Sequence, residues 1–171
     1  MRKLLVAGMI VLLPAGLVST PADALAGRPA AAVAKAKPKL GPFGFGKVRL
    51  GMTAKQARKT RQVVLKSAPG GSCSGWDLKS HRTPKDSFGL YLSKKKGVAV
   101  IFAQKGMKTP RGIGLGSTAA QVRKAYPKFH KVEYGYFIAV PRNKKAIYMV
   151  GFAKGRVAEM SLALRTQDCV Q

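Results

Sequence analysis

The stretch Leu50–Lys59, LGMTAKQARK, occurs a second time as Leu115–Lys124, LGSTAAQVRK. Seven of the ten positions are identical, and the two copies are 65 residues apart. Self-similarity at a fixed offset indicates two copies of one small structural unit in tandem. This repeat therefore predicts the architecture of the whole folded region.

Each copy of the repeat also carries a signal for the start of a helix. Thr53 and Thr118 are followed three residues later by Gln56 and Gln121, which is the capping-box pattern. In this pattern the threonine hydroxyl accepts from an amide of the first turn, and the glutamine side chain accepts from the amide of the cap. The pattern predicts two helices, over residues 53–66 and 118–126.

Beyond each helix the apolar residues alternate with a period of two, which is typical of strands. The predicted strands cover residues 88–93, 98–104, 132–140, 146–153 and 156–164. The predicted fold class is α+β: two tandem helix-plus-antiparallel-meander repeats that form one curved sheet with helices on one face. The predicted repeat units are residues 41–106 and 107–171.

The N-terminus has the pattern of a secretory signal. Arg2 and Lys3 precede the apolar run Leu4–Leu13, and Ala22–Ala24 fits a small-residue cleavage site. The alternative is a buried N-terminal helix. Residues 1–26 are therefore predicted to be a signal peptide, and the Ala, Pro and Lys-rich residues 27–40 a disordered linker. No stretch is long and apolar enough to span a bilayer, so we expect a secreted, extracellular protein, with association to the cell envelope left open.

The charge is strongly one-sided. The chain has 32 Lys and Arg residues against 6 Asp and Glu, a net charge of +26. Such a charge favours anionic partners, although the alternative is that it only keeps an exported protein in solution. The 21 lysines outnumber the 11 arginines, and sequence-specific nucleic-acid recognition depends mainly on bidentate arginine contacts. Sequence-specific nucleic acid is therefore not the expected partner.

The two cysteines, Cys73 and Cys169, are predicted to form a disulfide, because two cysteines in an oxidising compartment commonly pair. The bond would tie the first unit to the C-terminus. The alternative is a catalytic or metal-binding cysteine, but no second sulfur or nearby histidine gives ligand spacing. We therefore predict neither a metal site nor a cofactor.

The shared motif Gly-Ser/Met-Thr-x-x-Gln-Val/Ala-Arg resembles the small repeat of the β-lactamase inhibitory proteins. It is also similar to outer-membrane lipoproteins of the SmpA/OmlA (BamE) type. The resemblance covers about residues 45–170 and implies one curved sheet backed by helices, whose concave face binds a protein. The chain departs from both families, because each unit has one cysteine instead of its own disulfide, and the lipoprotein cysteine is absent. The resemblance therefore implies no inhibitory residue and no lipoprotein role.

Candidate binding residues are tyrosines on predicted strands and lysines in predicted hairpin turns. An aromatic patch among lysines suits recognition of a partner, although tyrosines on strands can equally be core and lysine runs can be solvated turns. The candidates are Tyr91, Lys94, Lys95, Lys96, Tyr134, Tyr136, Lys144, Lys145 and Tyr148.

Together these features predict a monomeric, non-enzymatic binding protein that recognises an acidic protein or an anionic cell-envelope polymer through its sheet face. Two alternatives stay open. A cationic antimicrobial or membrane-active factor is disfavoured by the lack of a long basic amphipathic helix. A secreted hydrolase would need a pocket that unites His81 or His130 with a carboxylate.

Overall fold

Both capping boxes are present in the computed structural model, which describes residues 38–68, 70–133 and 135–170. Thr53 Oγ1 accepts from the Gln56 amide at 3.3 Å, and Gln56 Oε1 accepts from the Thr53 amide at 2.9 Å. The equivalent distances for Thr118 and Gln121 are 3.2 and 2.8 Å. They start the helices α1 (Ala54–Lys59) and α2 (Ala119–Ala125).

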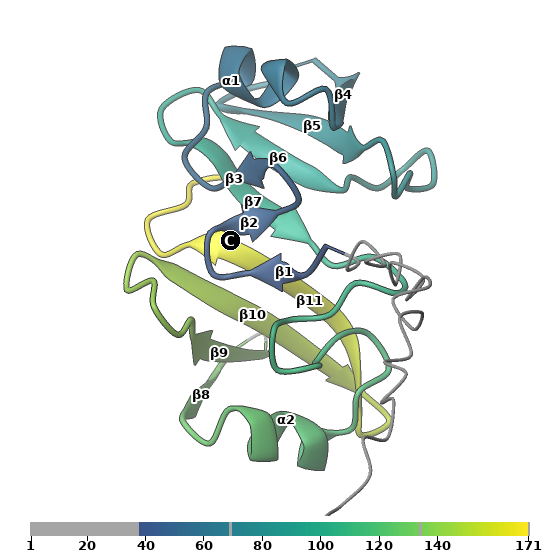
Figure 1. Cartoon of the computed structure of the whole chain (residues 1–171), viewed down its shortest axis with the longest axis vertical. Helices are drawn as coiled ribbons and strands as arrows, with labels where there is room; N and C mark the ends of the chain where they lie inside the picture. Colours follow the sequence, from purple (N-terminus) through teal and green to yellow (C-terminus); the bar gives the residue numbers. More distant parts are fainter. Residues whose placement is uncertain (1–37, 69, 134, 171) are drawn as a thin grey trace, which may run out of the picture. The chain divides into compact units, whose positions relative to one another are not determined.

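Each helix is followed by a four-stranded antiparallel meander, and the two meanders share one eight-stranded sheet in the order β4-β5-β6-β7-β11-β10-β9-β8 (Figure 1). The meanders join where β7 pairs with β11, with Ile101 opposite Leu162. The strands of the first meander are β4 (Val63–Ser67), β5 (Cys73–Leu78), β6 (Leu90–Ser93) and β7 (Gly97–Phe102). Those of the second are β8 (Phe129–Val132), β9 (Gly135–Ala139), β10 (Ala146–Ala153) and β11 (Arg156–Leu164).

A second, three-stranded sheet packs across the middle of the large one (Figure 1). It consists of β1 (Leu40–Gly41), β2 (Gly44–Phe45) and β3 (Val48–Arg49). The side chains of Leu40, Phe45 and Val48 are buried in the main core. The Tyr148 hydroxyl donates to the Leu40 carbonyl oxygen at 2.9 Å, which ties the small sheet to β10.

The predicted α+β class with helices on one face is wrong. The described residues are mostly β, and the two helices contain only six and seven residues. The small sheet, and not a helix layer, covers the centre of the large one.

The predicted linker also extends too far, because Leu40 is buried in the core. Residues 1–37, with the predicted signal peptide, lie outside the described residues. Within the part described, no helix is long and apolar enough to cross a membrane.

The first helix is much shorter than the prediction of residues 53–66. It ends at Lys59, and Arg61 adopts a left-handed backbone with φ of 58°. The next residues, Val63–Ser67, form β4 and pair with β5. Two successive valines favour an extended backbone, so strand pairing replaces the second half of the predicted helix.

The predicted strand over residues 132–140 is instead the hairpin of β8 and β9, in which Val132 pairs with Gly135. Gly135 has a φ of 142°, and a Cβ at this position would lie 2.6 Å from the Val150 carbonyl oxygen. Close approach of β10 therefore requires glycine here.

The large sheet has an apolar cluster on each face. The main core lies between one face, the small sheet and the two helices. The opposite face carries a smaller cluster around Val100, Ile147 and Ala163, with half-buried aromatic side chains beside it. We call this second surface the open face.

Candidate functional site

The open face bears a row of partly exposed apolar side chains. Because strand residues alternate between faces, β10 directs Tyr148 and Val150 into the core and Ile147 and Met149 to the open face. The half-buried members on this face are Tyr91, Phe102, Phe137 and Met149. Exposed apolar surface of this kind is typical of ligand or protein contact sites.

A groove of about 460 Å³ lies on the open face. Three aromatic rings follow one another along it: the Phe88 and Tyr91 centroids are 5.3 Å apart, and those of Tyr91 and Phe102 are 5.5 Å apart. Met149 and Gly151 of β10 also line it. The volume falls in the range of small-ligand pockets and of pockets that receive one anchor side chain.

The charge of the groove differs from that of the whole chain. Among the described residues no lysine or arginine lines it, whereas two acidic residues, Asp86 and Glu159, do. An anion in the groove would meet these carboxylates without a lining lysine or arginine to bind it. The groove therefore suits an apolar group, and an anionic group must be bound elsewhere.

One wall of the groove is a loop fixed by a partly buried ion pair. Lys66 Nζ lies 3.6 Å from Asp77 Oδ2, with side chains 19% and 3% exposed. The ammonium also donates to Thr83 Oγ1 at 2.8 Å and to the Ser87 carbonyl oxygen at 2.7 Å. Asp77 Oδ1 accepts from the Thr83 hydroxyl at 2.6 Å and from the Gly89 amide at 3.0 Å. These bonds hold residues 83–89, including Phe88, in one conformation.

The wall also depends on a glycine in β5. A Cβ at Gly75 would lie 2.2 Å from Cδ1 of Phe88, so the ring rests directly on the backbone. We expect Gly75→Ala to push Phe88 out of the groove and to lower the free energy of unfolding by about 1–3 kcal/mol, as in other overpacked sites. Urea denaturation measures the loss, and Gly71→Ala, where a Cβ meets open space, is the control.

The same ion pair predicts how stability depends on pH. Burial by itself would raise the pKa of Asp77, but the bonds from Thr83 and Gly89 and the Lys66 ammonium outweigh burial and hold the pKa below its ordinary value of 3.8. A lowered native pKa gives stability that is present above pH 3.8 and is lost as the pH falls through the native value. Asp77→Asn should flatten this acid limb in a series of urea denaturations. Asp86→Asn, which removes an exposed carboxylate from the same loop, is the matched control.

The predicted lysines are brought together at one end of the large sheet. The register places the β6–β7 turn, the end of β11 and the start of β10 side by side, on the left in Figure 1. Arg165 joins the end of β11 to the start of β10, because its amide donates to the Lys145 carbonyl oxygen at 2.9 Å. We call this cluster of exposed cations the basic end: Lys94, Lys95, Lys96, Lys144, Lys145 and Arg165.

The predicted tyrosines do not form one patch. Tyr91 lies on the open face in the groove. Tyr148 is 1% exposed in the core, where burial and the neighbouring Tyr126 raise its pKa, so it cannot contact a partner. Tyr136 packs between Phe129 and Phe152, with ring centroids 5.2 and 5.3 Å away, beside the main core. Tyr134 lies outside the described residues.

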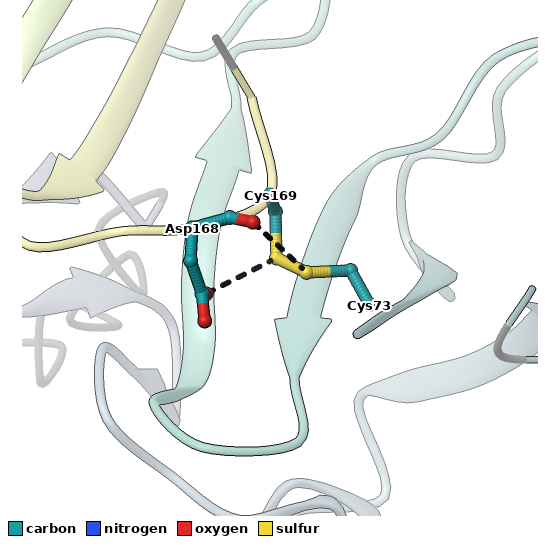
Figure 2. A group of neighbouring side chains, drawn as sticks. All are labelled: Cys73, Asp168 and Cys169. Carbon is teal, nitrogen blue, oxygen red and sulfur yellow. Dashed lines mark hydrogen bonds between the residues drawn. A yellow bond between two sulfur atoms is a disulfide. The ribbon is translucent and has the colours of Figure 1, made fainter. Parts of the chain in front are cut away.

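The predicted disulfide between Cys73 and Cys169 is confirmed (Figure 2). It fixes the C-terminal segment on the open face, where Cys169 and Val170 pack against the apolar cluster. A disulfide is consistent with an extracellular or periplasmic location. Asp168 lies beside the bond, with its oxygens 3.7 and 3.8 Å from the sulfurs. These approaches are contacts, because a disulfide sulfur carries no proton, and bonded sulfurs do not supply thiolate ligands for a metal.

Neither histidine joins a carboxylate in the groove. The His81 ring packs edge-on against Phe45 at 5.4 Å, and its Nδ1 lies 2.9 Å from Ser80 Oγ. His130 is exposed on β8, opposite Phe137. The pocket that the hydrolase hypothesis requires is therefore not formed by the groove residues.

Sequence reasoning missed most of the groove. Phe102 and Met149 occur in runs that are apolar at nearly every position, 98–103 and 146–150, and such runs indicate strands with two apolar faces. These runs could have predicted that the open face is apolar. Phe88 and the ion pair that fixes its loop have no local pattern, because Lys66, Asp77 and Thr83 meet only in the folded chain.

The chain matches no family model and no curated protein. Among solved structures, the uncharacterised protein yfeY from Escherichia coli matches with 13% identity and a TM-score of 0.45. The match covers 73% of this chain and 99% of yfeY. The resemblance of the repeat motif to the β-lactamase inhibitory proteins and SmpA/OmlA lipoproteins stays a prediction.

Proposed function

We propose that this protein is an exported, non-enzymatic binding protein that recognises an acidic protein through its open face. The basic end binds carboxylates of the partner, and the groove receives an apolar side chain. The observation that carries the proposal is the convergence of two separate lysine runs at one end of the sheet, while the groove on the open face has no lysine or arginine among its described lining residues.

The spacing of the two elements supports a macromolecular partner. Lys145, directly before β10, lies six residue steps from Gly151 in the groove, which is roughly 20 Å at about 3.3 Å per step. Only an extended surface spans both elements at once. An anionic envelope polymer satisfies the basic end but supplies no apolar group for the groove, so a protein is the better fit.

The test compares two variants of equal net charge. The first carries Lys94→Gln, Lys95→Gln, Lys96→Gln, Lys144→Gln and Lys145→Gln. The second carries the same change at five exposed lysines elsewhere: Lys55, Lys59, Lys79, Lys105 and Lys154. Each is immobilised and exposed to culture fluid and cell-envelope extract of the producing cells.

We expect an acidic protein to bind the wild type and the second variant, and to bind the first variant at least about tenfold more weakly. Equal loss in both variants would contradict recognition by the basic end, because net charge alone would explain the binding. Capture of anionic polymer alone would mean that the partner is an envelope polymer and not a protein. Leakage of anionic vesicles on addition of the protein would favour the membrane-active alternative.

A further inference from the structure

A second cavity, of about 820 Å³, lies at the end of the sheet opposite the basic end. Its walls are the loop that joins the two meanders, helix α2 and the start of β11. Of the residues that the structure describes, no acidic one lines it and four cationic ones do: Lys108, Arg111, Lys124 and Arg156. We call this cavity the basic cleft.

Two of the four cations are held in place by the backbone. Arg156 Nη1 donates to the Gly116 carbonyl oxygen at 3.1 Å, and Arg111 Nη1 donates to the Ala125 carbonyl oxygen. The Arg111 guanidinium also lies 5.1 Å from the centre of the Tyr126 ring. A guanidinium has five N–H donors, so each of these groups keeps donors for a ligand while its position is already fixed.

The loop that carries Lys108 and Arg111 is itself tightly folded. Thr109 is buried, and its Oγ1 accepts from the Ile113 amide at 3.2 Å. A Cβ at Gly114 would lie 2.2 Å from the Met107 carbonyl oxygen, so the two sides of the loop are in direct contact. The Gly116 amide donates to the Val157 carbonyl oxygen at 2.8 Å, which joins the loop to β11. Little reorganisation is therefore needed for a ligand to bind.

In the part of the chain that the structure describes, no carboxylate forms an ion pair with a cation of the cleft. Among the described residues the ion pair found is Lys66 with Asp77, which belongs to the wall of the groove. Four like charges around one concavity repel one another, and a cleft concentrates their field on its interior. An anion in the cleft would relieve this repulsion.

We propose that the basic cleft binds a phosphate group, either free or esterified. A tetrahedral dianion offers several oxygens, which match the planar fork of an arginine and the point charge of a lysine. The proposal does not depend on the function assigned to the open face, because the four cations of the cleft belong neither to the groove nor to the basic end.

The test is a titration of the full mature chain with inorganic phosphate and with glycerol phosphate, followed by amide NMR shifts at constant ionic strength. Chloride and sulfate titrations serve as the anion controls. We expect saturable shifts confined to residues 108–125 and the neighbourhood of Arg156. Binding of glycerol phosphate as well as phosphate would show that an esterified group enters the cleft, whereas binding of phosphate alone would show that the free ion is the ligand.

Variants make the assignment specific. Lys108→Gln, Lys124→Gln and Arg156→Gln should each weaken binding by roughly tenfold, as expected for loss of a charge-assisted contact. Arg82→Gln removes the same charge from an exposed position outside the cleft and should leave the affinity unchanged. The two hydrogen bonds that fix cations of the cleft come from Arg111 and Arg156, so the lysine variants leave both intact. Shifts spread over the whole basic surface, or equal weakening in Arg82→Gln, would overturn the proposal.

Discussion

Replacing Lys66 by Met should lower the free energy of unfolding by about 1–3 kcal/mol, because it leaves the buried Asp77 carboxylate without its cation while the carboxylate keeps its other hydrogen bonds. The substitution also removes the donors that hold the Thr83 and Ser87 backbone, so residues 83–88 should lose their fixed position. Urea denaturation at neutral pH measures the first effect, and hydrogen exchange of the loop amides measures the second.

The double variant Lys66→Met, Asp77→Asn is the control for this prediction. Because it removes the charge that the single variant leaves unpaired, it should recover part of the lost stability. A loss below about 1 kcal/mol in the single variant would mean that the ion pair contributes no more than an exposed one, and the account of the groove wall would be wrong.

Removal of the disulfide should have a larger effect on stability. Cys73 and Cys169 are separated by 96 residues, and a cross-link of that span stabilises by roughly 4–5 kcal/mol in the chain-entropy model. Cys73→Ala with Cys169→Ala should therefore lower the free energy of unfolding by several kcal/mol. It should also release the C-terminal segment from Val100 and Ala163 on the open face.

The measurement is urea denaturation of the wild type and the double variant, each with and without reductant. Reductant should bring the wild type to the stability of the variant and should leave the variant unchanged. Near-equal stability of the oxidised wild type and the variant would contradict the prediction, because the cross-link would then contribute little to the folded state.

The sequence predicted those elements whose signals are local. The capping boxes at Thr53 and Thr118 correctly marked the starts of α1 and α2, since a capping box is completed within four residues. Strands β10 and β11 have the predicted bounds, because both are rich in apolar residues and the Lys154–Gly155 turn separates them. Local periodicity and turn chemistry were sufficient in these places.

The errors occur where tertiary contacts decide. Helix propensity alone did not show that Val63 and Val64 pair with β5, so the first helix was predicted too long. The small sheet is built from two-residue strands in a Gly and Pro-rich segment, which has the composition of a linker. Its place in the core follows from long-range contacts such as Tyr148 with Leu40, which no local pattern encodes.

The sequence also predicted one part of the candidate site, the basic end, and missed the other part, the groove. The lysine runs were identified from their turns, and the register of the sheet then placed both at one end. The groove was not predicted, because its rings come from β6, β7 and a loop whose position depends on Lys66 and Asp77. Residues that come together from distant parts of the sequence form no periodic pattern, so sequence alone does not identify them.

The most direct test of the proposed function is the salt dependence of affinity for the captured acidic protein. It is measured for the wild type, for the five-lysine variant of the basic end and for Tyr91→Ala in the groove. Charges at an interface rim determine salt dependence, whereas a buried apolar contact contributes affinity that salt does not screen. The basic-end variant should therefore bind more weakly with a flatter salt dependence, and Tyr91→Ala should bind more weakly with the salt dependence unchanged. If Tyr91→Ala binds like the wild type and high salt abolishes all binding, charge alone accounts for the interaction and recognition by the open face is contradicted.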